Sequence, residues 1–373
     1  MKAVSYRQNR DNNLSRTARY ILEAGEVTKS EISRALRLSM PTVLNCIKEL
    51  SERGIIHEVG KDKSTGGRKP STISVVPDLF FSIGIEITAN HITFVAVNMK
   101  AEIIGSERIR HMFEHSENYY LELAKKLSDF ILRMQIPRDK VLGVGISVPG
   151  IIVPEESRLV VSHVLHLHDI DLASRFKHIN FPLHFENDAN CAALAEIKYI
   201  SKTALYLSLS NSVGGAVYID QSIYYGDFYK SGEFGHMILK PGGKRCYCGK
   251  QGCMDAYCSA RLLSDYTDGN LELFFKKLSK KDEKALKIWD KYLEYLALAV
   301  SNLHLAFDCE IVLGGYVGSY IEPYMDELSS HLKKYLLFDD KLPDFLYPCR
   351  FKHEAAGVGI AMYFIHRYFA KLD

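Results

Sequence analysis

Residues 232–255 read GEFGHMILKPGGKRCYCGKQGCMD, and three of the eight cysteines of the chain fall within this short segment. Zinc prefers four soft or borderline ligands in a tetrahedron, and three thiolates with one imidazole complete that set without leaving an open position. Glycine tolerates positive φ angles, so the glycines of the segment let a short backbone turn around one ion. The alternative is a set of reduced loop thiols or a disulfide pair. The segment predicts a structural Zn²⁺ site with the ligands His236, Cys246, Cys248 and Cys253.

The same segment resembles the signature of the ROK family, which contains sugar kinases and sugar-responsive repressors. Glu233-Phe-Gly-His236 precedes a C-x-C-G-x-x-G-C-x-acid pattern that ends at Asp255. The resemblance extends over nearly the whole chain. It implies an α/β two-lobe fold of the actin-like ATPase (ROK) type, preceded here by an N-terminal winged helix-turn-helix domain.

Composition and charge limit the class of protein. A chain of 373 residues that is 47% hydrophobic and 25% charged is expected to form two or three globular domains. No apolar run is long enough to cross a bilayer, and the polar start of the chain lacks the apolar part of a signal peptide. We therefore expect a cytoplasmic protein with reduced cysteines and no membrane partner.

The charge of the chain is unevenly placed. The first 78 residues carry 14 Lys and Arg against 9 Asp and Glu, whereas the remaining residues carry 33 against 36. A basic head on a slightly acidic body indicates that only the head meets a polyanion.

Residues 14–53 have the pattern of three helices. Thr28-Lys-Ser-Glu31 is a capping box that opens the second helix, and a proline in the first turn is compatible with a third helix that starts at Ser39. The buried stripe of the third helix is expected to comprise Val43, Ile47 and Leu50. A short helix, a turn and a longer helix are typical of a helix-turn-helix. The side chains predicted to contact DNA from the third helix are Ser39, Thr42, Asn45 and Lys48.

Two short apolar runs, 55–59 and 72–75, predict the strands of a wing. The basic tip between them contains Gly-Gly-Arg68-Lys69-Pro and resembles the wing of ROK repressors. Arginine suits the narrow minor groove, where the potential is most negative, so we expect Arg68 and Lys69 to contact DNA. A helical protein-interaction module is the alternative that helix periodicity alone does not exclude. The wing and the charge favour double-stranded operator DNA as the partner.

Two loops that cradle nucleotide phosphates in ROK kinases are altered in this chain. Residues 84–89 read GIEITA at the place of an Asp-x-Gly-Gly-Thr loop, and residues 210–216 read SNSVGGA at the place of Gly-Thr-Gly-x-Gly-Gly-Gly. Amides approach a phosphate closely only where no side chain intrudes. The third nucleotide element, Leu313-Gly314-Gly315, is retained, although a strand-to-helix turn explains it equally well. We therefore expect no catalytic residue, with Asp188 at the position of the family's general base.

The sugar side of the family's cleft is better retained. Residues 185–190 read FENDAN at the end of an apolar strand, where a carboxylate can hydrogen-bond a sugar hydroxyl. Taken alone, the Asn-Asp pair is an ordinary helix N-cap. By resemblance the sugar-binding residues are Asn187, Asp188, Glu233, His236 and Asp255. One ring nitrogen of His236 would hold zinc while the other faces the ligand.

The sugar itself is left open by two departures from the family pattern. Asp255 replaces the usual glutamate, and the family's Asn and Trp are absent from residues 162–167. The chain is also expected to form one long helix at 282–307 and another helix at 320–335.

The leading hypothesis is a sugar-responsive DNA-binding regulator that acts as a repressor and forms a homodimer or a dimer of dimers. An ATP-dependent sugar kinase that retained a DNA-binding head is the alternative, and a body that only assembles subunits is a third hypothesis. The predicted domains are a winged helix-turn-helix at 1–76, a first lobe at 77–188 completed by a C-terminal helix at about 355–373, and a second lobe at 189–354 with the zinc loop.

Overall fold

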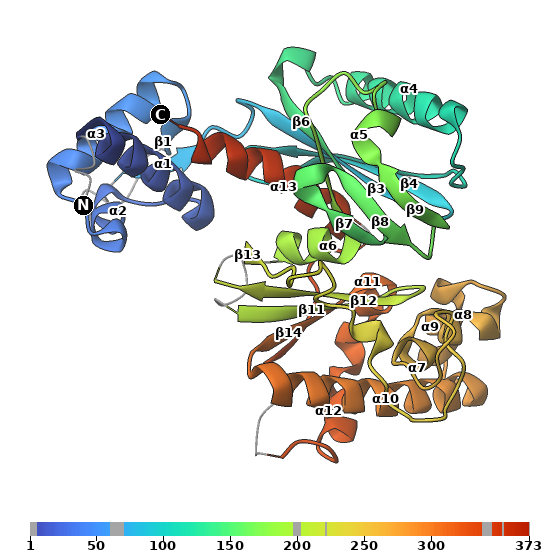
Figure 1. The fold of residues 1–373 in the computed structure, drawn as a ribbon. Helices are drawn as coiled ribbons and strands as arrows, with labels where there is room; N and C mark the ends of the chain where they lie inside the picture. Colours follow the sequence, from blue (N-terminus) through green and yellow to red (C-terminus); the bar gives the residue numbers. More distant parts are fainter. Residues whose placement is uncertain are drawn as a thin grey trace. The chain divides into compact units, whose positions relative to one another are not determined.

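The computed structural model describes residues 6–59, 71–196, 203–220, 222–337, 345–352 and 354–372 (Figure 1). Within these ranges no helix is both long and apolar enough to cross a membrane. Internal contacts divide the chain into two compact units. Unit 1 contains Met1–Ile146, Ala173–His184 and Ile360–Asp373, and unit 2 contains Ser147–Leu172 and Phe185–Gly359. The domain boundaries at 76 and 188 stay a prediction.

The N-terminal module of unit 1 consists of three helices and a two-stranded antiparallel sheet. Its elements are α1 (Tyr6–Ala24), α2 (Lys29–Leu36), α3 (Met40–Glu52), β1 (Ile56–Val59) and β2 (Thr72–Val75). The strands pair from Ile56 opposite Val75 to Val59 opposite Thr72, so the predicted wing strands are confirmed. The expected capping box is also present, because Thr28 Oγ1 accepts from the Glu31 amide and Glu31 Oε2 accepts from the Thr28 amide.

Apolar side chains spaced by one helical turn build the core of this module. The predicted stripe on α3 is buried, and Cys46 extends it. The buried partners from the other two helices are Leu14, Ala18, Ile21 and Ile32. Burying one such face leaves the opposite face of α3 for solvent or a ligand.

The first five-stranded sheet has the strand order β10-β6-β3-β4-β5, and most of its residues belong to unit 1. Its strands are β3 (Phe81–Ile87), β4 (His91–Asn98), β5 (Ile103–Arg110), β6 (Val141–Val148) and β10 (Leu183–Asn187). Helix α4 (Glu117–Arg133) packs on it through Phe130, whose ring stacks on Phe94 with centroids 5.5 Å apart. The last helix, α13 (Ala355–Ala370), lies so close to β6 that a Cβ at Gly145 would come within 2.5 Å of Ile360.

Unit 2 contains a second five-stranded sheet in the order β13-β12-β11-β14-β15. Its strands are β11 (Thr203–Leu209), β12 (Val213–Ile219), β13 (Ser222–Ile223), β14 (Glu310–Gly314) and β15 (Leu346–Pro348). Strands β11 and β14 are parallel, whereas β11 and β12 are antiparallel. A three-stranded sheet is formed by β7 (Ile151–Val153), β8 (Arg158–Ser162) and β9 (Leu167–Asp171).

Helices surround the second sheet. Those used below are α6 (Asp188–Glu196), α7 (Asp255–Cys258), α8 (Arg261–Ser264), α9 (Leu271–Ser279), α10 (Glu283–Phe307), α11 (Gly315–Ile321) and α12 (Met325–Leu332). The core between sheet and helices includes Trp289, Phe274 and Leu296, which are all almost fully buried. Helix α10 confirms the long helix expected at 282–307, with Asp282 as its N-cap.

The single helix expected at 320–335 is wrong. The structure has α11, a 3-10 turn at Glu322–Tyr324 and then α12. Pro323 explains the interruption, because proline has no amide hydrogen and its ring clashes with the preceding turn of a helix.

Candidate metal loop, ligand pocket and DNA-binding helix

The four residues predicted to bind metal lie together in unit 2. One ligand atom from each of His236, Cys246, Cys248 and Cys253 lies within 4.8 Å of all the others. Zn–S bonds of about 2.3 Å in a tetrahedron place two sulfur atoms about 3.8 Å apart. Cys248 Sγ and Cys253 Sγ are 3.7 Å apart, and Cys246 Sγ lies 3.9 Å from His236 Nδ1. The donor set and its spacing therefore fit one tetrahedral metal ion.

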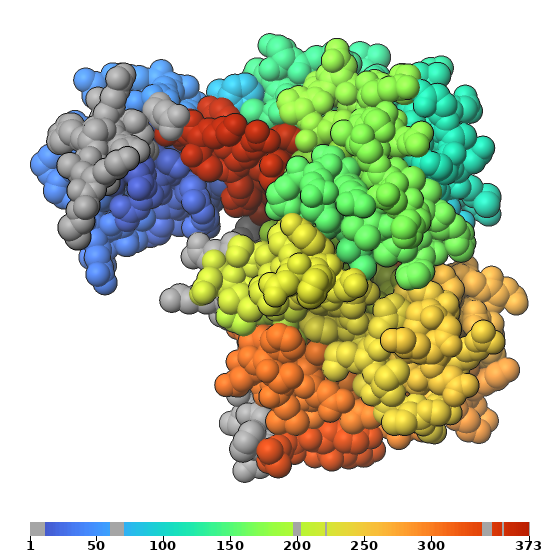
Figure 2. All heavy atoms as spheres, in the orientation of Figure 1, coloured from blue at the N-terminus to red at the C-terminus, as the bar shows by residue number. Residues whose placement is uncertain are grey.

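The backbone of the loop explains why these ligands meet. Isolated bridges pair Ile238 with Cys253 and Arg245 with Gln251, so the chain doubles back on itself. Gly252 makes this possible: its φ is +86°, and a Cβ there would lie 1.9 Å from the carbonyl oxygen of Lys240. In the space-filling view, the yellow atoms of this region and the orange atoms of the helices that follow form one continuous surface within unit 2 (Figure 2).

His236 uses its two ring nitrogens on different sides. Nδ1 faces the cysteine cluster, whereas Nε2 lies 3.2 Å from the hydroxyl of Tyr247 and 3.9 Å from Glu233 Oε2. Tyr247 also meets the ring of His163 edge-on, with centroids 6.2 Å apart. Tyr247 was missed in the sequence, although its place between two metal ligands could have drawn attention to it. The candidate metal ligand His236 therefore lies between the cysteine cluster on one side and Tyr247 with an exposed carboxylate on the other.

Asp255 is buried, with 6% of its surface exposed. Its Oδ2 accepts a hydrogen bond of 2.7 Å from the amide of Val213, the first residue of β12. Burial raises the pKa of this carboxyl above its ordinary value. The side chain therefore fixes the start of β12 from a position two residues after the last cysteine ligand.

A small pocket in unit 2 is lined by three of the five residues predicted to bind sugar, namely Asn187, Asp188 and Glu233. Its volume is about 50 Å³. A single water needs about 10–15 Å³ of this measure, so the pocket holds an edge of a small ligand rather than the whole of it. His236 and Asp255 do not line it.

Asn187 and Asp188 play different parts in the pocket. The Asn187 side chain donates to the carbonyl oxygen of Gly150 at 2.9 Å and accepts from the amides of Ala189 and Asn190, so it caps α6. Asp188 Oδ1 accepts from the Ala189 amide at 3.0 Å. Burial, aided by the nearby charge of Glu233, raises the pKa of Asp188 to about 6. This carboxyl therefore exchanges its proton close to neutral pH.

Two tyrosines complete the pocket, and the sequence did not reveal them. Tyr225 donates to Glu186 Oε2 at 2.5 Å, and Tyr229 donates to Glu155 at 3.3 Å. Glu186 is buried, which raises its pKa. No local motif marks these pairs, because Tyr225 and Glu186 are 39 residues apart.

Hydroxyls of this chain accept hydrogen bonds from backbone amides at the first altered loop and at the retained third element. In unit 1, Thr88 Oγ1 accepts from the His91 amide at 3.0 Å and closes a tight turn. In unit 2, the amides at the start of α11 donate to hydroxyls of the chain: Gly315 to Tyr206 at 3.2 Å and Tyr316 to Ser210 at 3.3 Å. A Cβ at Gly314 would lie 2.0 Å from the Tyr206 hydroxyl, so the tyrosine covers the retained glycines.

The predicted DNA-contacting residues of α3 lie on its unburied face. Ser39, Asn45 and Lys48 are exposed and Thr42 is half-buried. Ser39 caps the helix, and its hydroxyl lies 2.8 Å from that of Thr42. Leu44 is 45% exposed on the same helix, and the sequence reading missed it. An apolar side chain there can contact a thymine methyl group. Arg68 and Lys69, the predicted wing contacts, lie outside the described residues.

Comparison with family models gives two matches. The ROK family model matches residues 82–367, and a winged helix-turn-helix DNA-binding model matches residues 18–57. The xylose repressor of Bacillus subtilis is 28% identical over 268 residues, which cover 70% of this chain and 68% of that protein. The N-acetylglucosamine repressor of Escherichia coli O157:H7 is 24% identical over 251 residues, which cover 64% and 60%.

Solved structures match the fold over similar or longer spans. A ROK family transcriptional regulator described as a homologue of the E. coli MLC protein has a TM-score of 0.76 at 18% identity, covering 97% of this chain and 98% of that one. A ROK family glucokinase from Streptomyces griseus, in complex with glucose and AMPPNP, has a TM-score of 0.66 at 20% identity, covering 76% and 98%. The expected two-lobe ROK fold with an N-terminal winged helix-turn-helix is confirmed.

Proposed function

Because the chain belongs to the ROK family and carries a winged helix-turn-helix, we propose that it is a sugar-responsive transcriptional repressor. One observation carries this proposal: a single chain combines an exposed polar face on α3 with a pocket that contains the titratable Asp188. The recognition helix of a helix-turn-helix contacts base edges with an exposed polar face of this kind. The relatives named above as repressors support the same function.

In the proposed pocket, Asp188 and Glu233 hydrogen-bond the hydroxyls of the sugar. Asn187 positions α6 and the backbone at Gly150, since its amide is already used there. The rings of Tyr225 and Tyr229 offer apolar surface to the ring carbons of the ligand. His236 and Asp255 hold the metal loop and the start of β12 beside this pocket, and direct sugar contact by either of them stays a prediction.

Xylose and N-acetylglucosamine are the first sugars to test, because relatives are named for these two. The pocket itself favours a ligand with several hydroxyls, since the carboxyl groups of Asp188 and Glu233 can accept hydrogen bonds from them. The small volume further implies that the pocket opens, or that part of the sugar extends beyond it.

The metal in this proposal is a structural Zn²⁺. Three thiolates and one imidazole would leave no ligand position for substrate, so the ion would hold the loop and fix the orientation of His236. Such an ion contributes its binding energy to the folding of the segment.

Sugar kinase activity is not part of the proposed function. The amides at the start of α11 are already bonded to Tyr206 and Ser210, so they are not free to hold a phosphate. Relatives named as kinases share the fold at identities too low to carry activity over.

The proposal is tested by selecting tight-binding duplexes from a random DNA pool and titrating the selected duplex at 0.15 M salt, roughly physiological. Xylose, N-acetylglucosamine and glucose are then added in turn. Asn45→Ala should weaken the selected complex by roughly 5- to 150-fold, since each base contact contributes about 1–3 kcal/mol. Asn302→Ala, an exposed change on α10, is the matched control.

Two results would contradict the proposal. One is that no duplex binds more tightly than random DNA, and the other is that no sugar of the panel alters the affinity for the selected duplex.

Specific operators usually need two modules at half-site spacing, so we propose that the chain acts as a homodimer. Sedimentation of the free protein tests that part independently.

A further inference from the structure

A larger pocket lies elsewhere in unit 2, and the proposed function does not use it. Its volume is about 340 Å³, which is within the range of small-molecule sites. The lining residues come from the metal loop, α7, α8 and α10, and they are Lys244, Tyr257, Leu262, Leu263, Lys284, Lys287, Ile288, Lys291, Tyr292 and Tyr295. None of these lines the sugar pocket.

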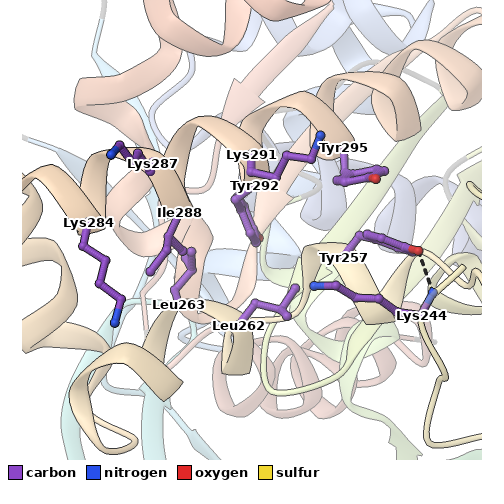
Figure 3. Close-up of a pocket in the computed structure, with 10 residues that line it drawn as sticks. All are labelled: Lys244, Tyr257, Leu262, Leu263, Lys284, Lys287, Ile288, Lys291, Tyr292 and Tyr295. Carbon is purple, nitrogen blue, oxygen red and sulfur yellow. Dashed lines mark hydrogen bonds between the residues drawn. The ribbon is translucent and has the colours of Figure 1, made fainter.

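Four lysines surround an apolar floor in this pocket. Figure 3 shows them spread around Leu262, Leu263 and Ile288. Three of the lysines, Lys284, Lys287 and Lys291, follow one another at spacings of three and four residues and so share a face of α10. Lys291 is paired with Glu294, but the other three lysines form no ion pair within the described residues. Three such ammonium groups on one concave, partly apolar surface attract an anion with more than one charge.

The acidic residues of α10 offset only the part of this charge that Lys291 contributes. Asp290 is bonded to His331 at 3.0 Å, and Glu294 pairs with Lys291 at 2.6 Å. No carboxylate lines the pocket. In the part of the chain that the structure describes, Lys284 and Lys287 form no ion pair, and the Lys284 ammonium lies 4.8 Å from the centroid of the Tyr266 ring.

Three tyrosines that line the pocket are held by contacts with the metal loop, with α7 and with one another. The Tyr257 hydroxyl accepts from the Lys244 amide at 2.7 Å, and a Cβ at Gly243 would lie 2.1 Å from that hydroxyl. Tyr257 packs on Tyr295 with centroids 4.2 Å apart. Tyr292 donates to the carbonyl oxygen of Cys258 at 2.7 Å. These contacts tie one side of the pocket to the metal loop and to α7.

From this arrangement we propose that the pocket binds a small phosphorylated metabolite. A phosphomonoester carries a charge of about −1.5 to −2 and three acceptor oxygens, which matches several lysine ammonium groups better than a single carboxylate would. The apolar floor accommodates the organic body of the ligand. The volume suits a sugar phosphate or a nucleotide and is too small for a folded partner.

The test is isothermal titration calorimetry of the full-length protein with inorganic phosphate, glucose 6-phosphate and ATP. Comparing the three affinities distinguishes free phosphate, a sugar phosphate and a nucleotide as the ligand. At least one of the two organic phosphates should bind more tightly than inorganic phosphate, and glucose should not compete. Lys284→Ala with Lys287→Ala should weaken that binding ~10-fold or more, as expected for the loss of charged hydrogen bonds. Lys276→Ala with Lys333→Ala removes the same charge from two exposed positions of unit 2, one on α9 and one just after α12, and should leave the binding unchanged.

Asp188→Asn separates this site from the sugar pocket. If the phosphorylated probes bind at the lysines, this change leaves their affinity as it is. Loss of binding in Asp188→Asn would place the phosphate in the sugar pocket and overturn the inference. The inference would also be overturned if the two double lysine variants bound the probe with equal affinity. The same holds if no probe bound the wild-type protein at millimolar concentration. A change of oligomeric state in the Lys284→Ala and Lys287→Ala protein without an effect on binding would overturn it too.

Discussion

The proton affinity of the Asp188 carboxyl group is set by its burial in the protein. Burial raises its pKa from 3.8 to about 6, so between these values the folded protein holds a proton that the unfolded chain releases. Stability therefore falls as pH rises through this window, and the loss is complete above about pH 6. Removing the charge should abolish this component.

We expect Asp188→Asn to raise the thermal midpoint relative to wild type at pH 7 by a few degrees and to have little effect at pH 4. Asparagine keeps the oxygen that accepts from the Ala189 amide, so the helix start is preserved. Differential scanning calorimetry at both pH values measures the difference. Asp129→Asn, on the exposed face of α4, gives the effect of losing a surface carboxylate. A gain for Asp188→Asn that is the same at pH 4 and pH 7 would show that the proton is not involved.

At the residue level, the sequence predicted groups that are close along the chain. The four candidate metal ligands lie within 18 residues, with glycines between them, so their spacing alone predicted that they meet. Tyr206 lies 109 residues before Gly315, and only the parallel pairing of β11 with β14 brings them together. Contacts of this kind depend on tertiary structure, and no local pattern encodes them.

At the level of elements, the start of α11 gives the main structural reason to expect no sugar kinase activity. Its first amides are bonded to Ser210 and Tyr206, and the turn at Thr88 is closed by its own side chain. Loss of one donor that stabilises developing charge lowers a rate by about 10²–10³. With both loops altered, we expect ATP turnover with xylose, glucose or N-acetylglucosamine to be at least ~10⁴-fold slower than that of a ROK glucokinase in the same coupled assay. ATP turnover at an ordinary kinase rate that Asp188→Asn abolishes would refute this expectation.

The metal loop is the element whose stability should depend on a bound ion. Cys248→Ser removes one thiolate, and we expect it to lower the thermal midpoint by about 10 °C or more and to reduce the zinc content measured with a colorimetric chelator. Cys309→Ser changes a half-buried cysteine outside the cluster and serves as the control. An unchanged melting curve in excess chelator would argue against a structural metal.

Helix patterns were predictable where local signals agreed. The capping box at Thr28, the stripe on α3 and the N-cap at Asp282 all combine a cap with apolar periodicity. The expected helix at 320–335 failed because periodicity was followed across Pro323. Gly215, in the second altered loop, also has a structural explanation, since a Cβ there would clash with the ring of Phe234. Retained glycines are therefore weak signs of a phosphate site in this chain.

For the whole molecule, the proposed function requires that sugar binding and DNA binding be coupled. A ligand changes DNA affinity only by its differential affinity for the two conformations that the protein adopts. Linkage is reciprocal, so an operator that loses affinity when sugar binds must weaken sugar binding by the same factor. Couplings of about 1–3 kcal/mol correspond to roughly 5- to 150-fold. The two titrations therefore check each other.

Glu233→Ala is the variant that separates sensing from DNA binding. Glu233 is an exposed carboxylate that lines the sugar pocket and lies far along the chain from α3. We expect the variant to bind the selected duplex with unchanged affinity and to require at least ~10-fold more sugar for release, because a hydrogen bond to a charged group is lost. Glu272→Ala, an exposed change on α9, should release DNA at the wild-type sugar concentration. Release of the duplex by Glu233→Ala at that same concentration would mean that the sensing pocket lies elsewhere, since a carboxylate that contacts the sugar cannot be removed without reducing its affinity.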